Sequence, residues 1–285
     1  MVEFLVAAGS ELHAEDASGS SALSIACDTN QFNLLEFLIE KGVDSSRKNM
    51  NGITVLWKAL INGNFDVTKE LLRCGADVND VNSQELSPLH MACSSRNVTL
   101  VKLLVDHGAN TVLKDSKGQS ALHCASSLGF VDIIEILLAA GASLESRTEP
   151  EGYTPLHVSC CSNEVDAAMY LIEKGADINM ESSTGLSAVH LAFAASLSLQ
   201  FIWSLHNAGA DFFKKTQRSQ NSVFHIICEN LDLSKELVKD ETMRALMLPL
   251  IHVKNADMQT GLHVACNCGN QHILTLFSRG VIVIH

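Results

Sequence analysis

The 285-residue sequence lacks a run of apolar residues long enough to cross a membrane. Its longest runs, such as IIEILLAAGA at residues 133–142, fall well short of the roughly 20 residues that a spanning helix needs. The first residues, MVEFLVAAG, also lack the basic stretch with which a secretory signal begins. We therefore expect a cytoplasmic protein that does not insert into a membrane.

Positive charge is scarce as well. The chain has 20 Lys and Arg against 32 Asp and Glu, and its net charge is −12. Residues 1–142 carry 10 basic and 17 acidic side chains (10 − 17 = −7), and the remainder carries 10 and 15 (10 − 15 = −5). Because neither half forms a basic arm, a nucleic-acid partner or an anionic membrane surface is disfavoured. The apolar share of 47% predicts an ordered protein.

Motifs of common enzymes and nucleotide-binding proteins are absent. The sequence contains no GxxxxGK[ST] or GxGxxG loop for phosphates, and no GxSxG or HExxH catalytic motif. We therefore expect no enzymatic activity, no cofactor and no small-molecule substrate. The nine cysteines are odd in number and lie in apolar segments, which is typical of buried thiols in a reducing compartment.

A repeated motif is present instead. TPLH at residues 154–157 has relatives that begin with a Ser or Thr at residues 21, 54, 87, 120, 187, 222 and 260. Along the chain, these starts are spaced by 33, 33, 33, 34, 33, 35 and 38 residues. A second marker runs in phase with the first and consists of Gly9, Gly42, Gly75, Gly108, Gly141, Gly175 and Gly209. Two markers that share one period indicate a repeat array.

A unit of about 33 residues with TPLH near its start and GAD near its end resembles the ankyrin repeat. The segment at residues 152–179, GYTPLHVSCCSNEVDAAMYLIEKGADIN, is most similar to it. The resemblance implies an all-α solenoid in which each unit is a β-turn finger followed by two antiparallel helices. It covers nearly the whole chain. It predicts a partial unit at residues 1–16, units at about 17–49, 50–82, 83–115, 116–149, 150–182 and 183–217, an irregular unit at 218–255 and a terminal unit at 256–285.

The residues of a unit also explain its helices in physical terms. Thr154 can cap the first helix with its hydroxyl, and Pro155 suits the first helical position. His157 then falls where a side chain can reach back to the cap. Each helix spans only two to three turns, less than the roughly 12 to 15 residues that an isolated helix needs, so stability must come from packing between units.

The sequence His-x-x-Cys occurs at residues 90–93, 157–160, 225–228 and 263–266, and Cys268 extends the last copy. Imidazole and thiolate are typical zinc ligands, and a His–Cys pair can also form a nucleophile with its base. The repeat offers a simpler explanation, because the histidine recurs beside the cap and the cysteine recurs in one slot of the unit. We therefore expect no metal site and no catalytic residue.

Ankyrin arrays bind proteins through their finger tips and the inner face of their first helices. Transferred to this sequence, the resemblance places a protein-binding stripe on these two surfaces, with Trp57 and Tyr153 as aromatic anchors. Trp57 occupies the usual histidine position, so inward packing is an equal alternative for it. Isolated exposed apolar residues are also common without any function. The candidate residues are Ile53, Trp57, Ile61, Leu86, Leu128, Tyr153 and Leu186.

Three fingers and one later segment depart from the pattern. Glu85, Gln220 and Met258 stand where other units have the glycine of the finger turn, so these fingers are less well specified. Residues 237–256 suggest an enlarged second helix that is interrupted at Pro249. The two ends, VEFLVAAGSEL and FSRGVIVIH, lack polar caps, so we expect a longer array or a partner that covers them.

Three hypotheses for function remain open. The leading one is a non-catalytic scaffold or adaptor that binds a protein partner. The second is a regulatory or targeting segment of a larger enzyme, channel or endosomal adaptor. The unit TVLWKALINGN at residues 54–64 is similar to units of large endosomal adaptors that combine a BTB domain, ankyrin repeats and a FYVE finger, which makes the endosome surface an alternative location. The third is a zinc-binding module.

Overall fold

The computed structural model describes residues 11–278, except residues 13, 17–19, 50–51 and 238. Over this part of the chain every regular element is a helix, and β structure is limited to isolated bridges that pair Glu15 with Ser21 and Lys215 with Ser222. The all-α class expected from the sequence is therefore confirmed. Most of the partial unit expected at residues 1–16, and residues 279–285 of the terminal unit, lie outside the described residues.

The chain divides into two compact blocks. The N-terminal block comprises residues 1–116 and 135–142, and the C-terminal block comprises residues 117–134 and 143–285. The N-terminal block contains α2 (Ala22–Asp28), α3 (Phe32–Glu40), α4 (Val55–Ile61), α5 (Phe65–Arg73), α6 (Pro88–Ser94) and α7 (Val98–Asp106). Helix α9 (Val131–Ala139) has residues in both blocks.

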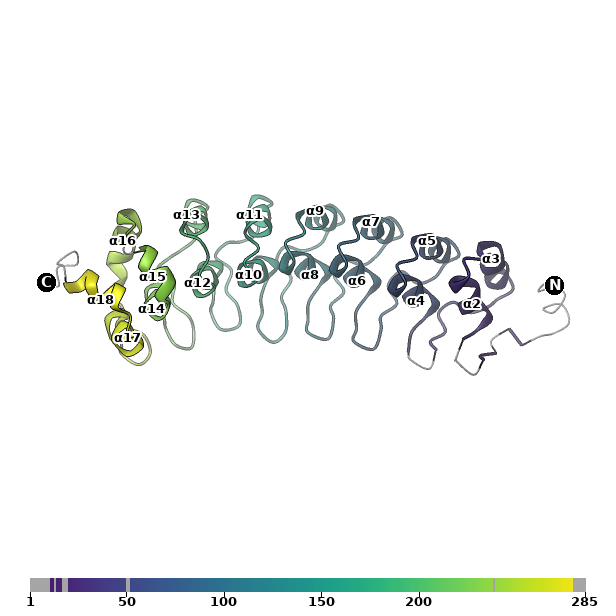
Figure 1. The fold of residues 1–285 in the computed structure, drawn as a ribbon, viewed down its shortest axis with the longest axis horizontal. Coiled ribbons are helices and arrows are strands. Elements are labelled where there is room, and N and C mark those ends of the chain that lie inside the picture. The colour runs from purple at the N-terminus through teal and green to yellow at the C-terminus, as the bar shows by residue number, and fades with distance from the viewer. Residues whose placement is uncertain (1–10, 13, 17–19, 50–51, 238, 279–285) are drawn as a thin grey trace. The chain divides into compact units, whose positions relative to one another are not determined.

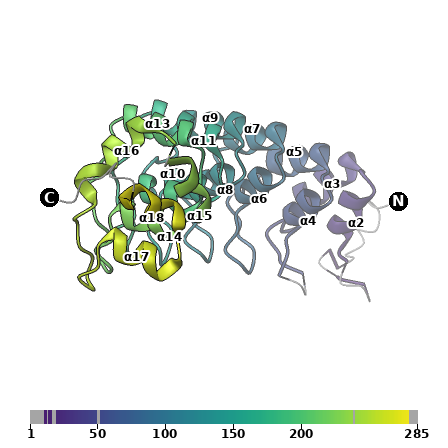
Figure 2. The same ribbon diagram turned by 60° about the vertical axis from the view of Figure 1, so that its left-hand side comes forward.

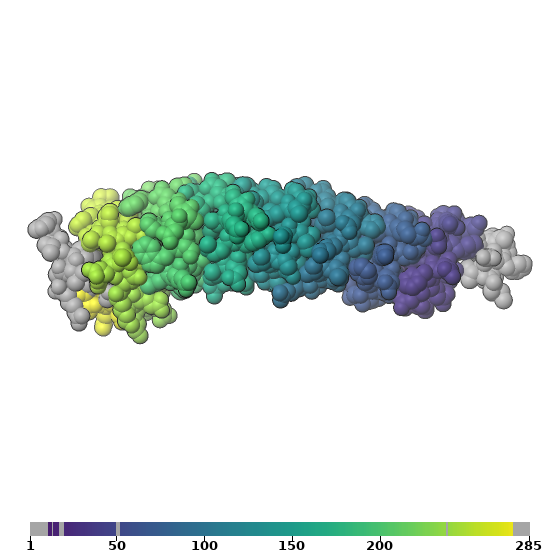
Figure 3. Space-filling view, turned by 90° about the horizontal axis from the view of Figure 1, so that it is seen from above, coloured from purple at the N-terminus to yellow at the C-terminus, as the bar shows by residue number. Residues whose placement is uncertain are grey.

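The C-terminal block contains the remaining elements. These are α8 (Ala121–Ser127), α10 (Pro155–Cys161), α11 (Val165–Glu173), α12 (Ala188–Ala194), α13 (Leu199–Asn207), α14 (Val223–Glu229), α15 (Leu231–Leu237), α16 (Glu241–Met247), the 3-10 helix η1 (Leu248–Leu250), α17 (Gly261–Cys268) and α18 (Gln271–Ser278). In the N-terminal block the first helices α2, α4 and α6 form one row and the second helices α3, α5 and α7 another; in the C-terminal block α10 and α12 lie in one row and α11 and α13 in another, and the fingers extend beyond the first helices (Figure 1). Seen from the second-helix side, the repeats of the C-terminal block follow one another in close contact (Figure 3).

Each first helix begins directly after the Ser or Thr of its motif. In α10, the hydroxyl of Thr154 accepts from the backbone N–H of His157, and the ring of His157 accepts from the backbone N–H of Thr154. This reciprocal cap satisfies two backbone donors that would otherwise be lost at the helix start. Five other first helices share it, namely α6, α8, α12, α14 and α17.

Second helices end at a glycine two residues beyond the last helical residue. In the six cases from Gly42 to Gly209, the φ angle lies between 81° and 95°, a left-handed conformation that glycine adopts without steric cost. The core lies between the two rows of helices. Its largest members in the N-terminal block include Leu56, Leu71 and Leu89, each no more than 1% exposed.

The segment at residues 237–256 differs from the expectation of one enlarged helix. Helix α15 ends at Leu237, and a separate helix, α16, begins after Asp240. The carboxylate of Asp240 accepts from the backbone N–H of Met243 at 2.9 Å and thereby caps the new helix. Helix α16 ends at Met247, and Pro249 lies in the 3-10 helix η1 that follows, so the α-helix does stop at this proline, but a first break already separates α15 from α16. Figure 2 shows α17 and α18 beside α14 and α15, the contacts expected of successive repeats.

The three fingers without glycine still form the turn. Glu85, Gln220 and Met258 adopt φ angles of 60°, 53° and 59°. In each of these fingers, a side-chain oxygen near the start of the finger accepts hydrogen bonds from backbone N–H groups and so stabilises the turn. In the last of these fingers, the amide oxygen of Asn255 accepts from the backbone N–H of Asp257 and of Gln259. These hydrogen bonds hold the turn even where the residue at its left-handed position pays a steric cost.

Candidate partner-binding groove

The histidine of the TPLH motif links its own cap to the next finger. The backbone N–H of Thr154 donates to Nδ1 of His157 at 3.2 Å, and Nε2 of His157 lies 3.0 Å from the backbone oxygen of Leu186. Because Nδ1 accepts from a backbone N–H, the ring proton is on Nε2, which donates to Leu186. In the same block Nε2 of His123, His190 and His225 lies 3.0 to 3.2 Å from the backbone oxygen of Tyr153, Lys214 and Gln259. Both ring nitrogens of these histidines therefore take part in hydrogen bonds within the protein.

Burial shifts the pKa of several cap histidines and of two of the thiols. It lowers the pKa of His157 to about 4 and also lowers the pKa of His190 and His225. It raises the pKa of the Cys160 and Cys228 thiols, which are fully buried. A nucleophilic cysteine needs an accessible thiolate beside an imidazole that can carry its proton. In the pairs His157–Cys160 and His225–Cys228 the thiol is buried and is not an accessible thiolate, so these two pairs do not provide this chemistry.

The same geometry gives no support to the zinc hypothesis. Within the ranges that the structure describes, no group of three or more His, Cys, Asp or Glu side chains could hold a metal ion. At the extended copy, Nδ1 of His263 accepts from the backbone N–H of Thr260 at 3.3 Å, while Cys266 and Cys268 are exposed. A structural zinc site needs four converging ligands, and these residues do not supply them.

Four of the predicted partner-binding residues meet in one groove of the N-terminal block. Ile53 and Leu86 come from two successive fingers, and Trp57 and Ile61 lie one turn apart on α4. The groove has a volume of about 280 Å³ and is also lined by Asn82, His90, Met91 and Ser94. Its deep side is formed by Trp57 and His90, which are buried, and its outer edge by Ile61, which is 55% exposed.

Polar groups in this groove are already engaged. The indole Nε1 of Trp57 donates to the backbone oxygen of Asp80 at 2.9 Å, and the hydroxyl of Ser94 donates to the backbone oxygen of His90 at 2.9 Å. The amide oxygen of Asn82 accepts from the backbone N–H of Leu86 at 3.0 Å. The groove therefore offers mainly apolar surface, which suits an apolar side chain rather than a charged ligand.

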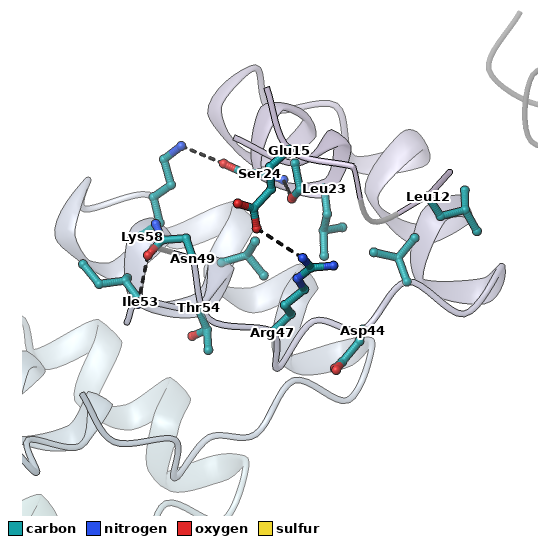
Figure 4. Close-up of a pocket in the computed structure, with 13 residues that line it drawn as sticks. Leu12, Glu15, Leu23, Ser24, Asp44, Arg47, Asn49, Ile53, Thr54 and Lys58 are labelled. Atoms are coloured by element: carbon teal, nitrogen blue, oxygen red, sulfur yellow. Dashed lines mark hydrogen bonds and ion pairs between the residues drawn. The ribbon is translucent and has the colours of Figure 1, made fainter. Parts of the chain in front are cut away.

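A second hollow in the same block is too small for a side chain. Figure 4 shows it beside Arg47 and Glu15, whose charged groups lie 3.7 Å apart, and beside Lys58, whose ammonium donates to the hydroxyl of Ser24 at 2.8 Å. Its volume is about 30 Å³. That is enough for about two water molecules.

The family model described as "Ankyrin repeats (3 copies)" matches residues 1–82, 63–148 and 141–216. These matches cover most of the chain. The chain belongs to the ankyrin repeat family. Ankyrin repeats are protein–protein interaction modules and are generally non-catalytic, and the helix pairs, fingers and caps described above are the elements of such repeats.

Curated relatives share parts of this ankyrin array. The B-cell lymphoma 3 protein homolog of Mus musculus is 34% identical over 146 residues, which are 48% of this chain and 31% of that protein. The alpha-latrocrustotoxin-Lt1a of Latrodectus tredecimguttatus is 29% identical over 93 residues, which are 32% of this chain and 6% of the toxin. The chain thus spans less than a third of the length of either relative.

A solved structure supports the ankyrin fold. The ankyrin repeat domain of Bcl-3, described as a unique member of the IkappaB protein family, superposes with a TM-score of 0.67 and 24% sequence identity. The match covers 73% of this chain and 94% of that domain. In addition, none of the helices in the described ranges is long and apolar enough to span a membrane.

The structure places the residue before each Ser or Thr differently from the expectation. Tyr153 and Leu186 were expected to be exposed at finger tips, but both are half-buried, as are Ile53 and Leu86. Their backbone explains this, because the oxygen atoms of Tyr153 and Leu186 accept from the histidine of the preceding ankyrin repeat. These residues therefore lie on the returning arm of the finger, against the first helix.

Three predicted residues lie in the C-terminal block, outside the groove. Tyr153 stacks on His157 with ring centroids 5.9 Å apart, and it lines a hollow of about 560 Å³ whose other lining residues include Lys117 and Glu151. Leu128 is 42% exposed at the end of α8. Leu186 is held in its finger by a hydrogen bond from its N–H to the hydroxyl of Ser182 at 3.1 Å.

Met91 forms one wall of the groove and is not among the residues predicted from the sequence. Of the predicted residues, Ile61 is the seventh after Thr54 and Leu128 the eighth after Ser120, whereas Met91 is the fourth after Ser87. Residues three positions apart lie on the same side of a helix, so Met91 faces the same way as Ser94, the seventh residue. Helical periodicity could therefore have identified it. The position of Trp57 at the bottom of the groove could not be predicted from the sequence and is seen only in the structure.

Proposed function

We propose that this ankyrin array is an adaptor that binds an apolar segment of a partner protein in the groove between α4 and α6. The observation that carries the proposal is the convergence of Ile53, Trp57, Ile61 and Leu86 from two fingers and a helix on one hollow. Trp57 contributes the floor rather than a projecting anchor, since only 4% of it is exposed. The aliphatic side chains of Ile61 and Met91 form the accessible walls.

The size of the groove favours a protein segment over a small molecule. Small-molecule sites enclose roughly 300 to 1,000 Å³ and bury most of their ligand. A hollow of about 280 Å³, open along Ile61 and Ser94, is just below that range. It can accept one large apolar side chain while the neighbouring residues of the partner cross the fingers.

The proposal includes a cytoplasmic setting. All nine cysteines are free thiols, which fits a reducing compartment. Because the chain spans only part of the proteins it resembles, an adaptor role within a larger polypeptide is included as well. The activities of those longer proteins are not transferred to this chain.

The test uses a photo-crosslinking amino acid placed at Ile61. The matched control carries it at Val112, which is apolar, lies in the same block and is 58% exposed against 55% for Ile61. We expect a partner that crosslinks from position 61 and not from position 112. The purified partner should then bind the chain in calorimetry, and Ile61→Asp should weaken that binding at least about tenfold.

Val112→Asp should leave the binding unchanged, because Val112 does not line the groove. Equal crosslinking from both positions, or a partner that binds the Ile61→Asp variant normally, contradicts the groove assignment. Circular dichroism of each variant confirms that an effect on binding does not arise from unfolding.

A further inference from the structure

The finger before α14 is strongly positive in a chain that is negative as a whole. Residues 214–222, KKTQRSQNS, contain two lysines, one arginine and no acidic residue, whereas the finger at residues 145–153 has one arginine and three glutamates. Lys214 is neutralised, because its Nζ lies 2.9 Å from the carboxylate of Glu181. Lys215 and Arg218 are exposed. The positive charge of this finger is therefore offset only at Lys214.

Lys215 reaches a second positive residue in the next finger. Its Nζ donates to the backbone oxygen of Lys254 at 3.0 Å. The same type of bond in the N-terminal block ends beside an acid, since Nζ of Lys48 donates to the backbone oxygen of Val81 at 2.8 Å and lies 3.3 Å from the carboxylate of Asp80. At Lys215 the residue that accepts the bond is itself a cation. Two like charges are thus brought together at this junction.

The side chains of Arg218 and Lys254 are available to a ligand. Both are exposed, and neither forms a hydrogen bond or ion pair with another residue in the described part of the chain. Their fingers are tied together, because the backbone N–H of Ala256 donates to the backbone oxygen of Ser219 at 2.8 Å. Asp257 is the one acid of the finger at residues 254–260, so positive charge remains in excess. Guanidinium and ammonium groups bind carboxylates through charge-assisted hydrogen bonds.

Met258 adds exposed apolar surface to the same finger. It is 65% exposed and adopts a φ angle of 59°, which a glycine would adopt without steric cost. Packing within the chain therefore does not explain this side chain. A strained residue often marks a functional surface, and the flexible, polarisable methionine side chain suits contact with a partner.

We propose that the fingers at residues 214–222 and 254–260 form a second docking surface, which binds an acidic segment of a partner protein. Carboxylates of the segment lie against Arg218 and Lys254, and an apolar residue between them packs on Met258. This surface belongs to the C-terminal block and shares no residue with the groove between α4 and α6.

The charge of the chain favours a short acidic segment over a nucleic acid. With a net charge of −12, and with three glutamates in the finger at residues 145–153, the chain repels a polyanion that extends along the fingers. A short segment is less affected, because salt screens charges that lie more than roughly 8 Å away.

The experiment measures fluorescence polarisation of a labelled peptide, DEDLEDE, mixed with the whole chain. A peptide with the amide sequence NQNLQNQ is the control for charge. The test variant combines Arg218→Glu with Lys254→Glu. Its matched control combines Lys235→Glu with Lys239→Glu, two exposed lysines of the same block that lie outside the fingers. Both double variants change the net charge equally, and circular dichroism checks that each is folded.

We expect the acidic peptide to bind at least about tenfold more tightly than the amide peptide. The variant at Arg218 and Lys254 should weaken this binding at least about tenfold, and the control at Lys235 and Lys239 less than about twofold. Met258→Gly should weaken it about threefold without lowering the thermal midpoint, and should have no effect on a peptide with serine in place of leucine.

No binding of the acidic peptide, or an equal loss in the two double variants, contradicts the proposal, because binding would then not depend on these fingers. A single-stranded DNA of the same charge that binds more tightly than the peptide would assign the surface to nucleic acid and would also overturn it. Ile61→Asp should leave peptide binding unchanged. A loss in that variant would place the peptide in the groove and would reject the second surface alone.

Discussion

Nε2 of His157 lies 3.0 Å from the backbone oxygen of Leu186, a residue of the next repeat. The same ring accepts a backbone N–H at the start of its own helix. One side chain thus fixes where a helix begins and how the following finger is placed. The bond is partly buried, so it is partly shielded from competing water, and a lost donor leaves an unsatisfied acceptor.

The first prediction concerns the contribution of this bond to stability. His157→Ala should lower the free energy of unfolding by about 2 to 4 kcal/mol, because it removes the cap, the bond to Leu186 and a buried ring. The matched control is His263→Ala, which removes the same type of cap from α17 without a junction bond. We expect it to cost about 1 kcal/mol. Urea unfolding measures both, and equal costs would show that the junction bond contributes nothing.

A second prediction concerns acid. Burial lowers the pKa of His157 to about 4, whereas an unfolded histidine has a pKa of about 6.5. Between these values the unfolded chain binds the extra proton, so stability is complete above pH 6.5 and falls as the pH drops toward 4. At pH 5, His157 alone should cost about 2 kcal/mol. His190 and His225, whose pKa values are also lowered, act in the same direction.

Carboxylates contribute over a different range. The ion pair with Lys214 lowers the pKa of Glu181 below 4.5, so its effect on stability begins only as the pH falls through that value. A decline between pH 6.5 and 5 therefore reports on the histidines. Urea midpoints measured across this range test the prediction. Replacing His157 with Gln should flatten the decline, and an unchanged slope would assign it to other groups.

Local pattern predicts much of this fold because each repeat encodes its own helix limits. Thr154, Pro155 and His157 specify a helix start within four residues, and Gly175 specifies the end of the second helix. The exposure of Tyr153 and Leu186 could not be predicted in the same way. It depends on hydrogen bonds from the histidines of the preceding repeats to the backbone oxygens of Tyr153 and Leu186, and these bonds arise only when repeats pack together.

A third prediction concerns the last described finger. Met258 adopts φ 59° and is 65% exposed, so its side chain adds little packing in return for a left-handed backbone. Met258→Gly should raise the free energy of unfolding by about 0.5 to 1 kcal/mol, after allowance for the greater freedom of glycine in the unfolded chain. The opposite change, Gly118→Ala, should destabilise, because the new Cβ would lie 2.6 Å from the backbone N of Glu149. Calorimetric unfolding distinguishes the two effects.

A fourth prediction tests the close approach of α17 to α14. Gly261 occupies the first helical position of α17, where other first helices have Ala, Val or Pro. A Cβ at Gly261 would lie 2.5 Å from Cδ1 of Phe224 and 3.0 Å from Sγ of Cys228, and both side chains are fully buried. Gly261→Ala should therefore cost about 1 to 3 kcal/mol through overpacking, although alanine favours helices. Phe224→Leu in the same chain should recover part of this loss, since a smaller side chain leaves room for the added methyl group. Additive costs in the double mutant would mean that Gly261 is required for another reason.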